Sequence, residues 1–135
     1  MSRNLVQKVK ACGFAVLGAG LLAAPAGAQA PELHMLDGLA KGSWSLRIRD
    51  GGTKTLCLRN GRELLQLQHT ESGCRRVVLN DNVGSVTVQY TCPGNGYGRT
   101  TVRRESQRLV QIQTQGIQDG KPFSYSAEGR HLGRC

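Results

Sequence analysis

The chain has 135 residues and a formal net charge of +9, from 18 lysines and arginines against 9 acidic residues. If its first 28 residues form an export signal, the 107 that remain suffice for one small domain and exclude a multidomain protein. Aromatic residues make up only 4% of the sequence, so we expect a thin core that depends on cross-links.

Residues 1–28 have the three parts of a secretory signal peptide. Three basic residues precede the apolar run 11–22, and small residues end the segment at Ala26, Gly27 and Ala28. This pattern predicts cleavage after Ala28 and a periplasmic protein with a net charge of about +6. The apolar run is shorter than the ~20 residues of a membrane span, so no transmembrane segment is expected after cleavage.

The mature chain begins with residues 29–41, which show little periodicity and are expected to form a lead-in arm. Residues 42–49 then alternate: Trp44, Leu46 and Ile48 share one side, and Ser45, Arg47 and Arg49 share the other. Such alternation is typical of a half-buried strand. A turn at 50–52 leads into a second expected strand, 53–58.

A hairpin is expected between Cys74 and Cys92, with strands at 75–79 and 85–90. A three-residue loop ending in a left-handed Gly84 would place Val78 opposite Val88, and the two cysteines opposite each other. Directly opposed cysteines have the spacing that a disulfide needs.

The mature chain has four cysteines, an even number typical of two disulfides in an oxidising compartment. The hairpin selects Cys74–Cys92 and leaves Cys57–Cys135 as the second bond. A zinc site is the alternative, but the spacing contains no Cys-x-x-Cys pair and no histidine at zinc-finger distance. We therefore expect no metal.

Three more elements complete the expected fold. Residues 60–69 contain good helix formers and predict a short helix. Strands at 99–105 and 109–115 form a hairpin that pairs Val102 with Ile112, and a last strand begins at Phe123. The sequence thus predicts an all-β domain at 42–135, an antiparallel meander of about seven strands closed as a small barrel or sandwich, with one short helix and two disulfides.

The sequence contains no recognisable catalytic motif. Each histidine of the mature chain stands alone, with no carboxylate or cysteine at a spacing that suggests a shared site, and we expect all three to be solvent-exposed or loop residues: His34, His69 and His131. The acidic residues are scattered, so their spacing does not support a paired-carboxylate hydrolase. We therefore predict a protein that is not an enzyme, with no catalytic residues and no cofactor.

Arginines outnumber lysines by twelve to three in the mature chain. The strand assignment points four of them outward: Arg47, Arg49, Arg75 and Arg103. Guanidinium groups bind phosphate and carboxylate through two parallel hydrogen bonds, so one hypothesis is a face that binds anionic envelope lipid or polysaccharide. The alternative is a solvated surface that keeps an exported protein soluble. Nucleic acid is not expected as a partner, because export removes it.

A second hypothesis places a small apolar ligand, such as a lipid, inside a closed barrel. Its lining would comprise Trp44, Leu46, Ile48, Val78, Val88, Ile112, Phe123 and Tyr125. The same side chains could instead fill the interior as an ordinary core. The general prediction is a non-catalytic envelope binding or structural protein.

Several short motifs occur in a characteristic order: Gly42-x-Trp44, Cys57-Leu58, the two middle cysteines, and the runs 119–123 and 128–135. In this order they resemble an uncharacterised exported bacterial family, domain of unknown function thirty-six-seventeen. The resemblance covers residues 38–135 and departs from the family at Arg59-Asn60-Gly61, where an acidic, proline-containing segment is usual. It implies a small periplasmic protein and supplies no catalytic residue, substrate or cofactor.

Overall fold

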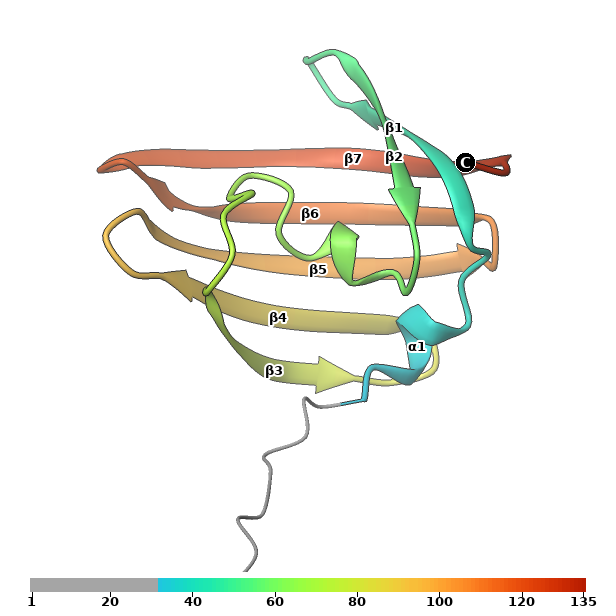
Figure 1. The fold of residues 1–135 in the computed structure, drawn as a ribbon, viewed down its shortest axis with the longest axis horizontal. Helices are drawn as coiled ribbons and strands as arrows, with labels where there is room; N and C mark the ends of the chain where they lie inside the picture. Colours follow the sequence, from blue (N-terminus) through green and yellow to red (C-terminus); the bar gives the residue numbers. More distant parts are fainter. Residues whose placement is uncertain (1–31) are drawn as a thin grey trace, which may run out of the picture.

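The computed structural model describes residues 32–135 (Figure 1). The expected signal peptide, its cleavage site and the first mature residues lie outside this range. The described elements are α1 (His34–Asp37), β1 (Gly42–Ile48), β2 (Thr53–Leu58), the 3-10 helix η1 (Arg62–Leu64), β3 (Arg75–Asp81), β4 (Ser85–Cys92), β5 (Gly96–Ser106), β6 (Leu109–Gln118) and β7 (Lys121–Gly133).

Seven antiparallel strands form one sheet in the order β2-β1-β7-β6-β5-β4-β3. The expected antiparallel all-β fold with seven strands is therefore confirmed. Only β3 to β7 follow one another as a meander, because β1 pairs with β7, and β2 lies at the opposite edge from β3. The sheet is open, with β2 and β3 as its edges, so the barrel form of the prediction does not occur. Figure 1 shows the β1–β2 hairpin turning across the meander, and Leu58 at the end of β2 joins the core. The open sheet with this hairpin folded across it is consistent with the sandwich form of the prediction.

The two faces of the sheet differ in polarity because side chains alternate along each strand. The inner face carries the buried residues Val86, Val88, Val102, Val110 and Ile112. It is covered by α1 and by the segment between β2 and β3, which contribute a second set of buried side chains: Met35, Leu36, Leu64 and Leu65. The outer face is polar and in contact with solvent, as is common for antiparallel sheets.

Trp44 is the largest fully buried side chain of the core. Its indole Nε1 donates a hydrogen bond of 2.8 Å to the carbonyl of Ala40, so burial leaves no polar group unpaired. A second device for close packing is Gly98, which lies opposite Tyr90 in the β4–β5 ladder. A Cβ atom at Gly98 would lie 2.3 Å from the Tyr90 ring, so the absent side chain makes room for the phenol.

The helix expected at 60–69 is largely absent. Only η1 forms a helical turn there, because Gly61 takes a left-handed φ of 77° just before it and the leucines that follow are buried in an irregular segment. The α-helix of the fold lies instead at His34–Asp37, within the expected lead-in arm. Met35 and Leu36 pack into the core, so this part of the arm belongs to the folded domain.

The β3–β4 hairpin has the expected register at its cysteine end, where Val78 pairs with Val88 and Arg76 with Tyr90. The loop differs from the prediction, because Gly84 is not among the left-handed glycines. Instead, the Asn82 side-chain oxygen accepts hydrogen bonds from the backbone N–H groups of Gly84 and Ser85, at 2.9 and 2.8 Å. A bulge between Val78 and Asn80 accommodates the one-residue shift in register between the loop end and the cysteine end of the hairpin.

Both predicted disulfides are present. Cys74–Cys92 closes the β3–β4 hairpin with Cα atoms 4.2 Å apart, and Cys57–Cys135 ties β2 to the end of the chain at 5.9 Å. Two disulfides are consistent with an oxidising, exported environment. The helices in residues 32–135 all fall short of the length and apolar character required to cross a membrane.

Candidate functional site

The outer face of β5, β6 and β7 presents a regular strip of mostly polar side chains, called the outer strip below. Register places it in four cross-strand rows: Tyr97–Ile117–Pro122, Arg99–Gln115–Ser124, Thr101–Gln113–Ser126 and Arg103–Gln111–Glu128. Successive rows are two residues apart, so the strip is roughly 20 Å long. Arg49 joins it at the third row, where its backbone N–H donates to the carbonyl of Ser126 at 2.8 Å.

Three hollows follow one another along the outer strip. The first, of about 280 Å³, lies beside Arg99 and Ser124. The second, of about 440 Å³, lies between Arg49 and Arg103. The third, of about 420 Å³, reaches the β1–β2 turn beside Arg47. All three are lined in part by Ser126, so they adjoin one another, and together they are called the trough below.

Several polar side chains along the trough have unused hydrogen-bonding capacity. The polar atoms of six of them make no side-chain hydrogen bond or ion pair with any other residue in 32–135: Arg49, Arg99, Gln113, Gln115, Ser124 and Ser126. Their donors and acceptors are therefore open to a ligand or to water. Guanidinium and amide groups so placed suit a ligand rich in oxygen atoms.

The end of the trough at the fourth row carries ion pairs. Glu128 accepts from Arg130 at 2.7 Å and from Arg47 at 3.3 Å, and Arg103 contacts Glu105 at 2.9 Å. The hydrogen bond from Arg130, followed by that from Gln111, lowers the pKa of the Glu128 carboxyl, so Glu128 is ionised at neutral pH.

Counting the paired groups, five arginines on and beside the strip face three carboxylates: Arg47, Arg49, Arg99, Arg103 and Arg130 against Asp50, Glu105 and Glu128. The face keeps an excess of two positive charges. Arg49 and Arg99 supply the positive charge that has no carboxylate partner within the described range.

The structure brings together three of the four arginines that the sequence proposes for an anion-binding face. Arg47, Arg49 and Arg103 line the same trough. Arg75 lies on the same side of the sheet but on the edge strand β3, opposite Thr91, and it lines none of the three hollows. Arg99 is the member that the sequence-based choice omitted, although it lies four residues from Arg103 on one strand and so faces the same side.

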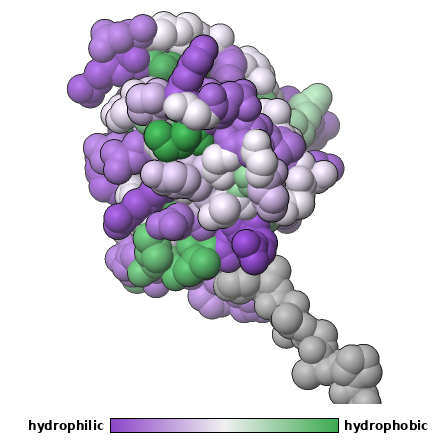
Figure 2. Space-filling model, turned by 90° about the vertical axis from the view of Figure 1, so that its left-hand side faces the viewer, coloured by the Kyte–Doolittle hydropathy of each residue, from purple (hydrophilic) through white to green (hydrophobic). Residues whose placement is uncertain are grey.

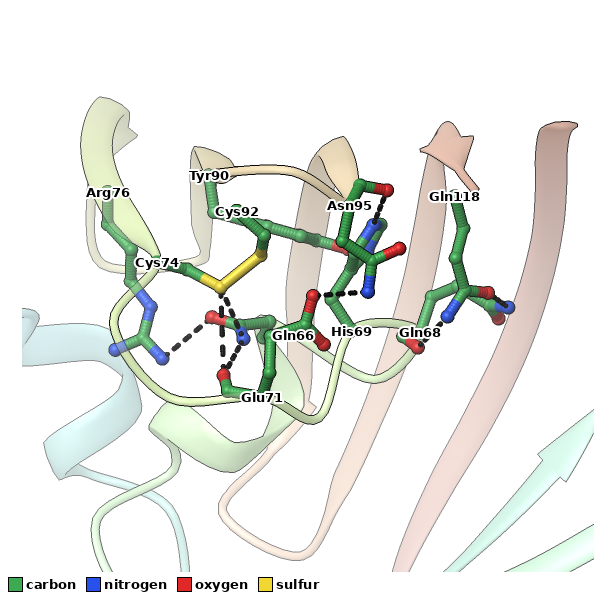
Figure 3. Close-up of a disulfide and its surroundings, with 10 residues drawn as sticks. All are labelled: Gln66, Gln68, His69, Glu71, Cys74, Arg76, Tyr90, Cys92, Asn95 and Gln118. Atoms are coloured by element: carbon green, nitrogen blue, oxygen red, sulfur yellow. Dashed lines mark hydrogen bonds between the residues drawn. A yellow bond between two sulfur atoms is a disulfide. The ribbon is translucent and has the colours of Figure 1, made fainter. Parts of the chain in front are cut away.

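A second polar cluster lies on the inner side, beside the Cys74–Cys92 disulfide (Figure 3). His69 lies in a loop, as expected, but it is fully buried. Its Nε2 is 3.4 Å from the backbone carbonyl of Asn95, which can only accept, so we assign the proton to Nε2. Nδ1 then accepts from the Tyr90 hydroxyl at 3.0 Å.

The remaining members of this cluster are held in the same way. The Asn95 amide donates to Glu71 at 2.6 Å, and Gln66 connects the loop to Arg76 at 3.0 Å. Burial raises the pKa of Tyr90 to about 12. Since both nitrogens of His69 are engaged and the ring is inaccessible, the cluster fixes the covering segment to the sheet rather than offering a base to a substrate.

His69, Glu71 and Cys92 place one potential metal-binding atom each within 4.8 Å of the others. Cys92, however, is bonded to Cys74, so its sulfur is no thiolate ligand in the oxidised protein. Two ligands remain, which is fewer than a structural zinc site requires.

The apolar-ligand hypothesis finds no support in the interior. Trp44, Leu46, Val88 and Ile112, four of its proposed lining residues, are fully buried against one another in the core cluster. The five hollows described for residues 32–135 are all open to solvent. These four residues therefore belong to a packed core, and Ile48, Val78 and Tyr125 pack against it partly buried.

Comparison with known proteins gives no relative: no protein-family model, no curated protein and no solved structure matches the chain.

Proposed function

We propose that this protein is an exported, non-catalytic binding domain whose outer strip binds an anionic component of the bacterial envelope. The observation that carries the proposal is the trough with two unpaired arginines, Arg49 and Arg99, among amide and hydroxyl side chains that have no partner in residues 32–135. Phosphate and carboxylate, whether on a lipid head group or on a polysaccharide, present the acceptor oxygens that guanidinium groups bind.

The geometry favours binding over catalysis. The trough combines positive charge with neutral hydrogen-bonding groups, and two of its three carboxylates are held by arginines, Glu105 by Arg103 and Glu128 by Arg130, while Asp50 lies apart at the β1–β2 turn. A carboxylate so paired is a poor general base at neutral pH. The buried His69 lies on the opposite face of the sheet and cannot contribute.

Periplasmic location and membership of the family domain of unknown function thirty-six-seventeen form part of the same proposal. The two disulfides support an oxidising compartment. The family resemblance rests on the motif order along residues 38–135. Mass spectrometry of the protein from a periplasmic extract tests the location, with Gln29 as the expected first residue.

The binding proposal is tested with inorganic polyphosphate and the oxidised mature protein, by titration at low and at physiological salt. The double substitution Arg49→Gln, Arg99→Gln is expected to weaken binding about tenfold or more, because each charged hydrogen bond contributes on the order of 1.5 kcal/mol or more. Both side chains are solvent-exposed and unpaired within the described range, so the fold should be unaffected.

The matched control is Arg59→Gln, Arg134→Gln, which removes the same charge from exposed positions outside the trough. If the ligand binds in the trough, the control variant should keep the wild-type affinity, apart from the small loss that any reduction in positive charge causes. If both double variants weaken binding equally, only net charge matters and the outer strip is not the site. If the wild type binds none of polyphosphate, a heparin-derived oligosaccharide and phosphatidylglycerol vesicles even at low salt, the proposal is wrong.

A further inference from the structure

Tyr97 occupies one end of the outer strip. Its side chain is 49% exposed and sits in the first row, with Ile117 and Pro122 as its cross-strand neighbours. Tyr97 is thus an exposed aromatic ring on a small apolar platform, next to Arg99 two residues further along β5. Exposed tyrosines on polar surfaces are frequent binding anchors, because they offer a flat apolar face together with a hydroxyl.

The chemical character of the side chains changes from row to row along the strip. The aromatic row is followed by a row with Arg99, Gln115 and Ser124, then by a row of uncharged hydrogen-bonding groups, and then by Arg103. Donors and acceptors without a partner in residues 32–135 line its second and third rows, whereas in the fourth row Arg103 is paired with Glu105 and Gln111 with Glu128. A ligand that matches it must be extended, must carry acidic groups at intervals, must be rich in hydroxyls, and must have a flat apolar patch.

An acidic polysaccharide has all four properties. The C–H face of a pyranose ring packs on an aromatic side chain, its hydroxyls pair with amide and hydroxyl groups, and its carboxylate or sulfate groups pair with guanidinium groups. An anionic lipid bilayer fits less well, because its flat charged surface does not follow a row of hollows among the side chains of the strip. The apolar part of the strip is also confined to one row.

We infer that the outer strip is a binding site for an extended acidic glycan, with Tyr97 stacking on a sugar ring and Arg99 and Arg49 holding its acidic groups. This inference rests on the proposed anion-binding function and specifies its ligand class. The distinguishing residue is Tyr97, because neither polyphosphate nor a lipid head group has a sugar face for it to contact.

The experiment compares three probes on the oxidised mature protein: inorganic polyphosphate, a heparin-derived oligosaccharide, and vesicles of phosphatidylglycerol. Tyr97→Ala is expected to weaken oligosaccharide binding by at least about fivefold, as is usual for an anchor residue, and to leave polyphosphate binding unchanged. Tyr97→Phe keeps the ring and should retain oligosaccharide binding within about twofold of wild type.

Each result decides one point. Oligosaccharide binding that does not respond to Tyr97→Ala overturns the stacking role and therefore this inference. Binding of polyphosphate or vesicles without any binding of the oligosaccharide also overturns it, while the broader anion-binding proposal survives. Failure of all three probes overturns the anion-binding proposal itself. A near-ultraviolet circular dichroism spectrum of Tyr97→Ala that matches wild type shows that its fold is intact.

Discussion

The Tyr90 hydroxyl lies 3.0 Å from Nδ1 of His69, and both side chains are completely buried. Tyr90 comes from β4, the strand next to the edge strand β3, and His69 comes from the irregular segment that covers the sheet. This hydrogen bond therefore joins the two layers of the fold. The His69 and Tyr90 rings also make an edge contact, with centroids 5.2 Å apart.

Removing the hydroxyl should destabilise the domain. Tyr90→Phe keeps the ring but leaves Nδ1 of His69 buried without a partner, which typically costs about 1–3 kcal/mol. Urea unfolding of the oxidised protein measures the loss. Tyr97→Phe, an equal change at an exposed ring, is the control and should stay within about 0.5 kcal/mol of wild type. Equal stabilities for the two variants would contradict a structural role for the buried bond.

Alkaline pH should weaken the fold through the same group. Burial, the most important cause, and the negative charges of Tyr125 and Glu71 raise the pKa of Tyr90 to about 12, against about 10 in an unfolded chain. The folded state therefore holds the proton more tightly. The contribution of the protonated Tyr90 hydroxyl to the stability of the fold is complete below pH 10 and is lost as the pH rises from about 10 to about 12.

The expected measurement is the free energy of unfolding across that pH interval. Wild type should lose stability steeply, and Tyr90→Phe should lose less, because its phenyl ring has no proton to release. Some pH dependence will remain in the variant, since burial also raises the pKa of Tyr125. Parallel curves for the two proteins would show that Tyr90 does not titrate in this way.

Much of the fold follows from alternation along the chain. Trp44 and Leu46 alternate with polar residues in β1, and the Val102–Ile112 pairing of β5 with β6 occurs as predicted. Long strands repeat this signal many times. Met35 and Leu36 belong to a helix of four residues, which is too short to show a helical period. Their burial depends on the sheet that receives them, and the local sequence does not encode it.

The β3–β4 loop shows how a correct register can follow from an incorrect turn. The sequence predicts a three-residue loop that ends in a left-handed Gly84. The Asn82 side chain instead caps the loop, and an extra residue in the β3 ladder restores the pairing of Val78 with Val88. Asparagine forms such local turns by bonding to the backbone two residues ahead. Sequence alone did not distinguish the two solutions because both use the same residue types.

This loop can be tested by two substitutions. Gly84→Ala should be neutral or slightly stabilising, because Gly84 does not have a positive φ and its Cβ position meets only the Asn82 oxygen at 3.8 Å. Asn82→Ala should lose about 1 kcal/mol with its two hydrogen bonds. Chemical denaturation measures both. A large loss for Gly84→Ala would instead favour the left-handed turn.

The two disulfides should contribute unequally to stability. Cys57–Cys135 spans 78 residues and Cys74–Cys92 spans 18, and chain entropy gives about 4.5 and about 3 kcal/mol for loops of these lengths. Replacing each pair by alanines should therefore cost more at Cys57 and Cys135, as measured by urea unfolding without reductant. A greater loss from the Cys74 and Cys92 pair would mean that packing beside buried Cys92 outweighs loop closure.

The candidate site was predictable only in part. Arginine excess and strand alternation identified Arg47, Arg49 and Arg103 as outward-facing residues. Strand order is what brings Arg49 beside β7, since the chain separates Arg49 from Ser126 by 77 positions and no local signal links them. The same non-local pairing excludes Arg75, whose strand is the far edge of the sheet. The positive charge of the site could be predicted from the composition. Which arginines lie next to one another depends on the order of the strands in the sheet.

Arg75 provides the last test. Because β3 lies two strands from β5, the Arg75 side chain starts about 10 Å from Tyr97 across the sheet and lines no hollow of the trough. Arg75→Gln should therefore change polyphosphate affinity by less than about twofold, the loss expected from a distant screened charge. Arg99→Gln removes the same charge from within the trough and should weaken binding several-fold more, in titrations at matched ionic strength. If Arg75→Gln were the more damaging variant, the binding surface would have to extend over β3 and β4, and the outer strip would be only one end of it.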